Sequence, residues 1–459
     1  MDLAAAPPEA LSPSAMKLSE LIGALSHALD ITEGQPAGHC VRCCWIGMHI
    51  GRAIGLPQDQ LWELYYTLLL KDLGCSSNAA RICELYLADD LGFKRDFKTV
   101  GDSLPQVLSF VLTHTGLKAG LAERFRSVMT ILKDGPAIAQ DLIATRCQRG
   151  AEIARLLRFP DGVAEGIYSL DEHFNGQGKP ARLAGEAIPV HARIALLAQV
   201  IDVFHTAGGR AAALREARKR AGSWFDPRLV DAFERAACAE EFWATLAAPH
   251  IDAAVAALEP GGREVALDDD YLDDIAAAFG QVVDSKSPFT SGHSERVALY
   301  TDLVAEAMGL SPERRRWLKR GALLHDVGKL GVSNSVLDKP GKLDAEEWEA
   351  MRHHAAYTEA ILSRVRAFSE LARVAAAHHE RLDGGGYPRG LKAEQIDIAT
   401  RIITVADIFD AITADRPYRG PIPIPRALAM MAGTVGTAID ADCFEALKAA
   451  LARLELARG

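Results

Sequence analysis

Two adjacent histidines stand directly before a glycine-rich turn in residues 378–388, which read HHERLDGGGYP. A histidine–carboxylate pair, His325-Asp326, ends the apolar stretch 321–324, and Asp407 lies within another apolar pattern. Burying such groups is costly unless a metal or an ion partner compensates their charge. Imidazoles and carboxylates are ligands that first-row transition metals accept. These residues therefore predict a metal-dependent site.

The order of these motifs resembles the HD-GYP family, the branch of the HD superfamily that hydrolyses bacterial cyclic dinucleotides. HD followed by GK at 325–329, and then HHExxDGxGYP at 378–388, carries the resemblance, which covers residues 288–445. It implies two divalent transition metal ions, iron or manganese, although the ligand types alone also permit zinc. It implies Asp326 as the carboxylate that bridges the metals. The implied ligands are His293, His325, Asp326, His354, His378, His379 and Asp407.

Some members of this family have a glutamate four residues before the first histidine that helps to hold a third metal. This chain has Phe289 at that position, which favours a two-metal site. Two cations can align a water for in-line attack on phosphorus and neutralise the charge that develops on the leaving oxygen. Phosphoryl chemistry needs little beyond such positioning and electrostatic stabilisation.

The resemblance also assigns residues to catalysis and to the substrate. Lys329 lies three residues beyond Asp326, so we expect its ammonium to reach a phosphate oxygen in the same site. Thr358 stands where relatives commonly have glycine, which is a minor departure. A tyrosine in the glycine-rich turn is expected to stack on guanine or to hydrogen-bond to phosphate, and guanidinium groups suit phosphate or guanine edges. The implied nucleotide contacts are Tyr387, Asp410, Arg416 and Arg419.

The elements that must position these residues are predicted to be helices. Apolar residues recur at helical spacing, for example at Ile402, Val405, Phe409 and Ile412, and few segments alternate with the period of a strand. This pattern predicts an all-α protein. Helical bundles commonly build metal sites from inward-facing side chains on several helices, as the scattered ligands here require.

An internal repeat organises the chain. His39 precedes Asp72 by 33 residues, just as His293 precedes Asp326. A glycine-containing turn that ends in proline stands 19 residues before Gln199 in the first half, and another stands 19 residues before Asp407 in the second. Such agreement in register predicts two copies of one helical domain.

We place the copies at 18–258 and 268–459, with helix breakers and an acidic stretch between them. The first is predicted to be a degenerate HD-type domain and the second the HD-GYP-like catalytic domain. They differ in length mainly between Cys75 and Arg146, where the first copy has about 46 extra residues of no evident purpose.

The first copy has lost most of the ligand set. Lys71 and Arg146 put cations where metals would bind, which opposes the binding of a further cation. We therefore expect no catalytic metal in this half. Either it binds a phosphate with these cations, or it serves packing or dimerisation, which we favour. The equivalent positions are His39, Lys71, Asp72, Arg146, Leu170, Asp171 and Gln199.

Composition limits the class of protein. The net charge of −10 and the lack of a long basic tract argue against direct nucleic-acid binding. No apolar run approaches the roughly 20 residues that span a bilayer, and residues 1–16 lack signal-peptide features, so we expect a cytoplasmic protein with no membrane partner. Cys40, Cys43 and Cys44 are interpreted as small buried apolar residues, because no second cysteine pair completes a zinc site.

The leading prediction is a phosphodiesterase that hydrolyses cyclic di-GMP to pGpG, with GMP as a further product left open. Two alternatives remain: a nonhydrolytic module that binds a cyclic dinucleotide and signals to a protein partner, or a phosphohydrolase for another nucleotide such as cyclic GMP-AMP. The sequence leaves homodimerisation and the identity of any protein signalling partner open.

Overall fold

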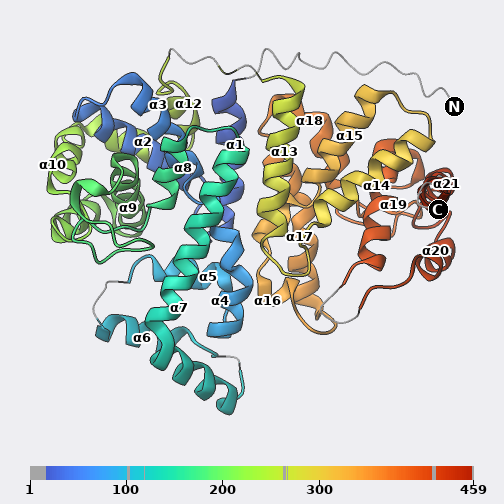
Figure 1. Cartoon of the computed structure of the whole chain (residues 1–459), viewed down its shortest axis with the longest axis horizontal. Coiled ribbons are helices and arrows are strands. Elements are labelled where there is room, and N and C mark those ends of the chain that lie inside the picture. Colours follow the sequence, from blue (N-terminus) through green and yellow to red (C-terminus); the bar gives the residue numbers. More distant parts are fainter. Residues whose placement is uncertain are drawn as a thin grey trace.

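The computed structural model describes residues 17–100, 104–117, 119–261, 265, 267–415 and 420–456. It confirms the predicted all-α class: in the described part of the chain, β structure is limited to isolated bridges such as that between Ala221 and Phe225. Figure 1 shows the first half, in blue to green, beside the second half, in yellow to red. No helix in the described ranges is both long enough and apolar enough to cross a membrane.

Within its described residues, the first half contains eleven α-helices and two 3-10 turns before residue 250, followed by one more helix. Their bounds are α1 Leu18–Thr32, α2 His39–Ala53, α3 Gln58–Leu70, η2 Cys75–Asn78, α4 Ala79–Tyr86, α5 Asp90–Phe97, α6 Leu104–His114, α7 Leu121–Leu156, α8 Asp161–Tyr168, η3 Gly185–Ala187, α9 Val190–Arg220, α10 Pro227–Ala236, α11 Glu240–Leu246 and α12 Ile251–Ala256.

The second half follows with a similar order of elements. Their bounds are α13 Asp269–Asp284, α14 His293–Ala307, α15 Pro312–Leu324, η4 Val327–Gly331, α16 Asn334–Leu337, α17 Ala345–Leu362, η5 Arg366–Phe368, α18 Ser369–Ala376, η6 Ala393–Gln395, α19 Ile398–Thr413, α20 Ile424–Ala432 and α21 Ala441–Leu456.

Equivalent positions in the two halves make equivalent contacts. Glu172 accepts hydrogen bonds from the backbone N–H groups nine and eleven residues later, and Glu380 does the same. Gly74 and Gly328 each pass so close to a facing helix that an added Cβ would lie 1.9 Å from a backbone carbonyl oxygen. Only glycine permits this approach. The same backbone constraints therefore shape the turn after the HD position in each half.

One apolar core crosses the boundary between the halves. It includes Leu25 of α1, Val283 of α13, Leu330 of η4 and Leu362 of α17, all of them buried. The helices α1 and α7 face α17 and α13, respectively, near the middle of the molecule (Figure 1). A second cluster lies within the second half alone. The two halves thus share much of their buried apolar surface.

The extra segment of the first half reaches the second half through α5. The buried Asp90 carboxylate accepts hydrogen bonds from the backbone N–H of Asn334, at 2.9 Å, and from the Ser333 hydroxyl, at 3.1 Å. The Nζ atom of Lys286 lies 3.4 Å from Asp90 and donates to the Leu330 carbonyl at 3.2 Å. These contacts hold the loop that continues from the HD pair.

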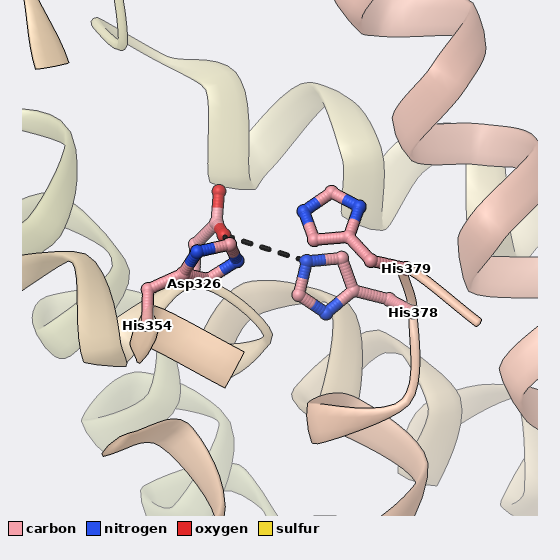
Figure 2. A group of neighbouring side chains, drawn as sticks. All are labelled: Asp326, His354, His378 and His379. Atoms are coloured by element: carbon pink, nitrogen blue, oxygen red, sulfur yellow. Dashed lines mark ion pairs between the residues drawn. The ribbon is translucent and has the colours of Figure 1, made fainter. Parts of the chain in front are cut away.

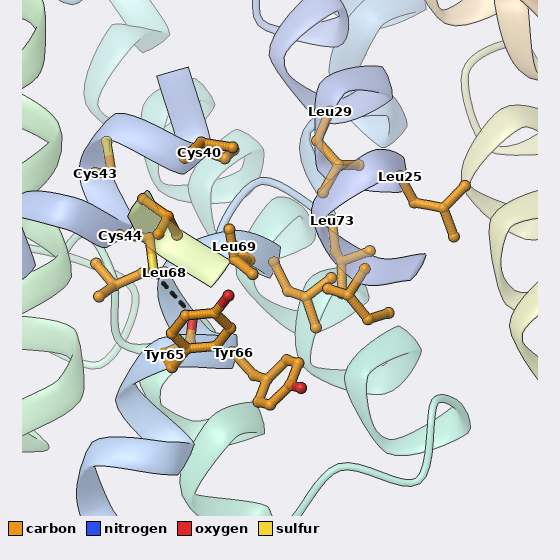
Figure 3. Packing of buried hydrophobic residues seen from close by; sticks show 14 of the residues in the cluster. Leu25, Leu29, Cys40, Cys43, Cys44, Tyr65, Tyr66, Leu68, Leu69 and Leu73 are labelled. Atoms are coloured by element: carbon orange, nitrogen blue, oxygen red, sulfur yellow. Dashed lines mark hydrogen bonds between the residues drawn. The ribbon is translucent and has the colours of Figure 1, made fainter. Parts of the chain in front are cut away.

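The three clustered cysteines are packed as the sequence predicts. Cys40, Cys43 and Cys44 are fully buried in the first-half core, close to Tyr65 and Leu68 (Figure 3). Burial raises the pKa of each thiol, so all three stay neutral. Their surroundings are those of small apolar side chains.

Candidate metal centre

The seven residues expected to bind metal converge in the second half. His293 begins α14, His325 and Asp326 follow α15, and the others come from α17, the turn after α18, and α19. Their donor atoms form two groups, each with all of its atoms within 4.8 Å of one another. The groups are His293, His325 and Asp407 on one side, and Asp326, His354, His378 and His379 on the other. Figure 2 shows the second group, with its rings gathered around Asp326.

Asp326 stands between the two groups. Its Oδ2 lies 3.4 Å from Nε2 of His293 and 3.3 Å from Nε2 of His325. Its Oδ1 lies 3.6 Å from Nε2 of both His354 and His378 (Figure 2). One carboxylate oxygen therefore faces each set of imidazoles, which is the arrangement that a bridging ligand requires.

The backbone fixes which nitrogen three of these rings present. The Nδ1–H groups of His325, His354 and His378 each donate at 2.6 Å to the carbonyl three residues earlier. Such second contacts fix the tautomer and orientation of metal-binding histidines. Four Nε2 atoms and Asp326 Oδ1 are buried without a hydrogen-bond partner in the described structure. The four nitrogens belong to His293, His325, His354 and His378.

Buried polar atoms without partners are rare in folded proteins. Here four imidazole nitrogens converge on the Asp326 carboxylate, whose Oδ1 is the fifth such atom, and together they form a donor set that fits two divalent metal ions. The residues that would hold the first ion are His293, His325 and Asp407, those for the second are His354, His378 and His379, and Asp326 would be shared.

Asp410 requires a correction. The sequence placed it among the nucleotide contacts, but its side chain is 1% exposed. Its Oδ2 accepts a hydrogen bond from Nδ1 of His293 at 2.7 Å, and its Oδ1 accepts one from Nε of Arg296 at 2.6 Å. With both oxygens engaged by protein donors, Asp410 has no open face for a nucleotide. It orients the His293 ring.

Removing the Asp410 carboxylate should weaken metal binding. We expect Asp410→Ala to lower metal affinity by about 10- to 100-fold, the usual cost of losing the partner of a metal-binding histidine. Titration of the metal against a competing chelator would measure it. Asp302→Ala is a matched control, because Asp302 also pairs with an arginine, Arg315, but is not among the clustered metal donors. Equal affinities for both variants would contradict this role.

The two groups of histidines differ electrostatically in the metal-free protein. Burial opposes the charge on His293, but its interactions with Asp326, Asp407 and Asp410 outweigh burial and raise its pKa to about 10. Asp326 and Asp407 similarly overcome burial and raise the pKa of His325 to about 9. Burial dominates at His354 and lowers its pKa to about 3. At pH 7 the His293 and His325 rings therefore carry protons and the His354 ring does not.

Metal uptake should consequently release protons. His293 and His325 are protonated below their pKa values, and a metal ion needs their neutral form, so raising the pH from 6 toward 9 removes the competing protons. We expect metal affinity to rise over this range, with release of about two protons per chain at neutral pH. Calorimetry in buffers of different ionisation enthalpy would count them. An affinity that stays constant between pH 6 and pH 9 would contradict this prediction.

Lys329 and Tyr387 lie at the centre, and their contact with a substrate stays a prediction. The Lys329 ammonium pairs with Asp326 Oδ2, and its side chain is partly exposed. The Tyr387 ring lies 4.8 Å from the His379 ring, measured between centroids. Arg416 and Arg419 lie outside the described residues. Thr358 bridges α17 and η4, because its hydroxyl donates to the His325 carbonyl and accepts from the Gly328 N–H, both at 3.0 Å.

In the first half, an ammonium group occupies the corresponding site. The Nζ atom of Lys71 lies 3.0 Å from Nε2 of His39 and 3.1 Å from Oε1 of Gln199, and it pairs with the Asp72 carboxylate. These three partners correspond to His293, Asp407 and Asp326 of the second half. Lys71 is 2% exposed, so this cation is closed to an external phosphate. The contact geometry therefore weakens the hypothesis that it forms part of an anion site.

Other donor atoms also cluster in the first half, but cations of the protein already accompany them. One group is His39, Cys43 and Asp202, and another is Glu33, Asp72 and Cys75. Arg42 pairs with Asp202 at 2.6 Å, and Lys98 pairs with Glu33 at 2.8 Å. The absence of a catalytic metal from this half stays a prediction, and the buried ammonium of Lys71 is the feature that supports it.

The fold and the site together define a class: an all-α protein with a buried histidine–carboxylate cluster whose donor set fits two metal ions. A family model described as HD domain matches residues 133–229 and 278–443, one segment in each half. The chain is 57% identical over 434 residues to 3'3'-cGAMP-specific phosphodiesterase 3 of Vibrio cholerae, covering 95% of this chain and 94% of the relative. It is 42% identical over 168 residues to a cyclic di-GMP phosphodiesterase response regulator of Xanthomonas campestris, covering 36% of this chain and 44% of the relative.

A solved structure also resembles this chain over nearly its whole length. The crystal structure of a cyclic GMP-AMP-specific phosphodiesterase of V. cholerae matches with a TM-score of 0.65 and 51% identity, covering 95% of this chain and 97% of the other. The chain belongs to the HD-domain family, among the HD-GYP-type cyclic dinucleotide phosphodiesterases. The predicted family and the general activity of a phosphodiesterase are thereby confirmed.

Proposed function

We propose that this protein hydrolyses 3'3'-cyclic GMP-AMP to a linear dinucleotide at the metal centre of its second half. The observation that carries the choice of substrate is the match to a relative named as specific for 3'3'-cGAMP across 95% of this chain. The match to the Xanthomonas campestris relative, which is named for cyclic di-GMP, covers only 36% of this chain. Cyclic GMP-AMP, an alternative in the sequence analysis, is therefore better supported than cyclic di-GMP, the main prediction there.

The residues of the centre suggest how the phosphodiester is handled. When bound, two divalent ions supply an activated water and neutralise charge on the phosphoryl oxygens. Asp326, His325, His354 and His378 keep the binding positions fixed, because all four side chains are buried and backbone carbonyls hold the three rings. We assign Lys329 to a nonbridging phosphate oxygen, since its ammonium already lies at Asp326.

Tyr387 provides a second polar contact for the substrate. Burial and the nearby Asp326 and Asp407 charges raise the pKa of its hydroxyl, so the hydroxyl stays protonated at working pH. A protonated phenol donates a hydrogen bond, which suits a phosphate oxygen beside the His379 ring. This assignment agrees with one of the two roles that the sequence suggested.

The test is a direct comparison of substrates. Protein purified without oxygen and supplied with iron or manganese is given 3'3'-cGAMP or cyclic di-GMP at equal concentrations, and products are separated by chromatography. We expect metal-dependent cleavage with kcat/KM for 3'3'-cGAMP at least about tenfold higher, and loss of turnover in His378→Ala. Preferential cleavage of cyclic di-GMP would favour the second candidate. Bound metal and nucleotide without turnover would favour a signalling module.

A further inference from the structure

The extra segment of the first half carries an exposed apolar stripe on α7. Leu121, Phe125 and Met129 follow one another at intervals of four residues, and Leu132 continues the same face of the helix. Their exposed fractions are 85%, 66%, 48% and 50%, in that order. α6 and the adjoining start of α7 project beyond the rest of the molecule (Figure 1). Large apolar side chains gathered in water in this way indicate an interaction surface.

The opposite face of this part of α7 is packed against the first half. Ile131 is buried, and the Ser127 hydroxyl donates to the Leu85 carbonyl of α4. The Arg124 guanidinium donates to the Leu112 carbonyl of α6 at 2.8 Å. These contacts hold the helix in place and turn the stripe outward. The stripe is therefore a preformed surface, which needs no ordering before it binds.

The apolar residues of the stripe are placed symmetrically about Phe125. They stand three and four positions before it and three and four positions after it, at Leu121, Ala122, Val128 and Met129. If two copies of this helix cross antiparallel with Phe125 on a twofold axis, Leu121 of each copy lies beside Met129 of the other. Side chains at intervals of four form the ridges that interlock in the commonest class of helix packing. The pattern therefore suits a second copy of the same helix, because a twofold contact uses one surface twice.

The charges beside the stripe are complementary under the same twofold axis. Glu123 lies two residues before Phe125 and Arg126 lies one residue after it, and both are exposed. They are three residues apart and so share one side of the helix. Reversing the helix about Phe125 brings Arg126 of one copy within one residue of Glu123 of the other. Because the contact is twofold, this pair of opposite charges forms twice.

The size of the surface fits a reversible dimer. Leu117 directly precedes α7 and is 64% exposed, which extends the apolar surface by one more large residue. The stripe and Leu117 together present roughly 600 Å², and pairing would remove roughly 1,200 Å² from water, at the lower end of the range for specific complexes. Interfaces of this size commonly give weak, concentration-dependent association.

We propose that the protein forms a twofold dimer in solution through α7, with Phe125 at the axis and a Glu123–Arg126 pair on either side of it. The contact lies outside the metal centre and is independent of which substrate is hydrolysed. A lipid surface fits the helix less well, because helices that lie in a membrane interface carry an excess of lysine and arginine. Here two exposed acidic residues offset two exposed basic ones: Glu123, Asp134, Arg126 and Lys133.

Analytical ultracentrifugation of the full-length protein between about 1 and 300 µM tests the dimer. We expect a monomer–dimer equilibrium with a Kd of about 1 to 100 µM. Phe125→Asp should raise that Kd at least about tenfold, because it places two carboxylates at the axis. Leu299→Asp should leave the Kd unchanged, since Leu299 is an apolar residue of α14 that is 52% exposed and lies outside the stripe. Thermal melting of each variant establishes that it is folded.

An exchange of charges tests the antiparallel register. Glu123→Arg and Arg126→Glu should each raise the Kd by about 3- to 30-fold, because each creates two pairs of like charge. The double variant should dimerise as tightly as the wild type. An equimolar mixture of the two single variants should form a heterodimer of similar Kd, because the mixture restores both pairs.

Three results would overturn the proposal. A wild-type protein that stays monomeric at the highest concentration does not pair through α7. A dimer that folded Phe125→Asp leaves intact uses another surface, and a failure of the double variant and of the mixture to recover dimerisation contradicts the register. If the monomer instead sediments with vesicles of phosphatidylglycerol and phosphatidylcholine, and Phe125→Asp abolishes that binding, the stripe contacts lipid and the pairing is wrong.

Discussion

Asp326→Asn should lose at least about 100-fold in metal-dependent turnover of the cyclic dinucleotide and should retain less than the full complement of metal. Asp326 is the one residue that faces both groups of histidines, with an oxygen 3.3 to 3.6 Å from four imidazole nitrogens. Asparagine preserves the shape but removes the charge and turns one oxygen into a donor. Because losing a mere partner of a ligand costs about 10- to 100-fold, losing the shared ligand should cost at least as much.

Elemental analysis of metal and initial-rate kinetics on the same preparation would measure both effects. Asp442→Asn is a suitable control, since Asp442 is an exposed carboxylate at the start of α21, outside the clustered donors. Full activity with two bound ions in Asp326→Asn would mean that the carboxylate does not bridge them.

Lys71→Ala should destabilise the protein by about 3–5 kcal/mol, although Lys71 lies in the half that we expect to bind no metal. Its ammonium is the partner of the buried Asp72 carboxylate and contacts His39 and Gln199. Burial opposes the charge on Asp72, but Lys71 overcomes it and holds the pKa of Asp72 below its usual range. Without the lysine, a carboxylate is left buried and largely uncompensated.

The destabilisation caused by Lys71→Ala should change with pH in a defined direction. A carboxyl with a lowered pKa stabilises the folded state above its unfolded pKa of about 3.9 and loses that contribution as the pH falls. The Lys71→Ala variant lacks this contribution, so its deficit should be largest at neutral pH and should shrink as Asp72 becomes protonated in acid. Urea unfolding followed by tryptophan fluorescence at pH 7 and pH 4 would measure it.

Lys448→Ala is the control for this experiment, because Lys448 forms a surface pair with Glu445 and should change stability by less than about 0.5 kcal/mol. A Lys71→Ala protein as stable as the control at pH 7 would show that the Lys71 ammonium is not needed to compensate the buried Asp72 carboxylate.

The sequence was most informative about which residues cluster at the candidate metal centre and about the fold class. Histidines and carboxylates within apolar helical patterns predicted a buried polar cluster, because burial without a partner is costly, and the seven residues do converge. The repeat was equally readable, since the 33-residue spacing from His39 to Asp72 matches that from His293 to Asp326. Helical periodicity correctly gave an all-α protein.

Other features depend on tertiary packing that spacing cannot reveal. Asp410 shares a helix face with Asp407, but only the fold shows that its carboxylate lies behind the His293 ring. A cavity lined by Phe289, Lys329 and Trp348 also draws its residues from segments that are separate in the sequence. Asp90 contacts the loop after η4 from 244 residues away in the chain. The shared core likewise follows from helices meeting across the predicted domain boundary.

The motifs could not predict the substrate, for a different reason. The motif HHExxDGxGYP describes metal ligands and a turn, and these act on the phosphodiester that all cyclic dinucleotides share. Base selectivity is set by side chains that contact the purine edges and faces, which the motif does not specify.

The most direct test of a two-metal phosphodiesterase centre in the second half is a metal count taken together with turnover. Wild-type protein and His378→Ala would be loaded with manganese under anaerobic conditions, desalted, and assayed for bound metal per chain and for cleavage of 3'3'-cGAMP. We predict two ions and metal-dependent cleavage in the wild type, with loss of both full occupancy and turnover in the variant. Cleavage by wild-type protein that holds no metal, or unchanged cleavage by His378→Ala, would contradict this account.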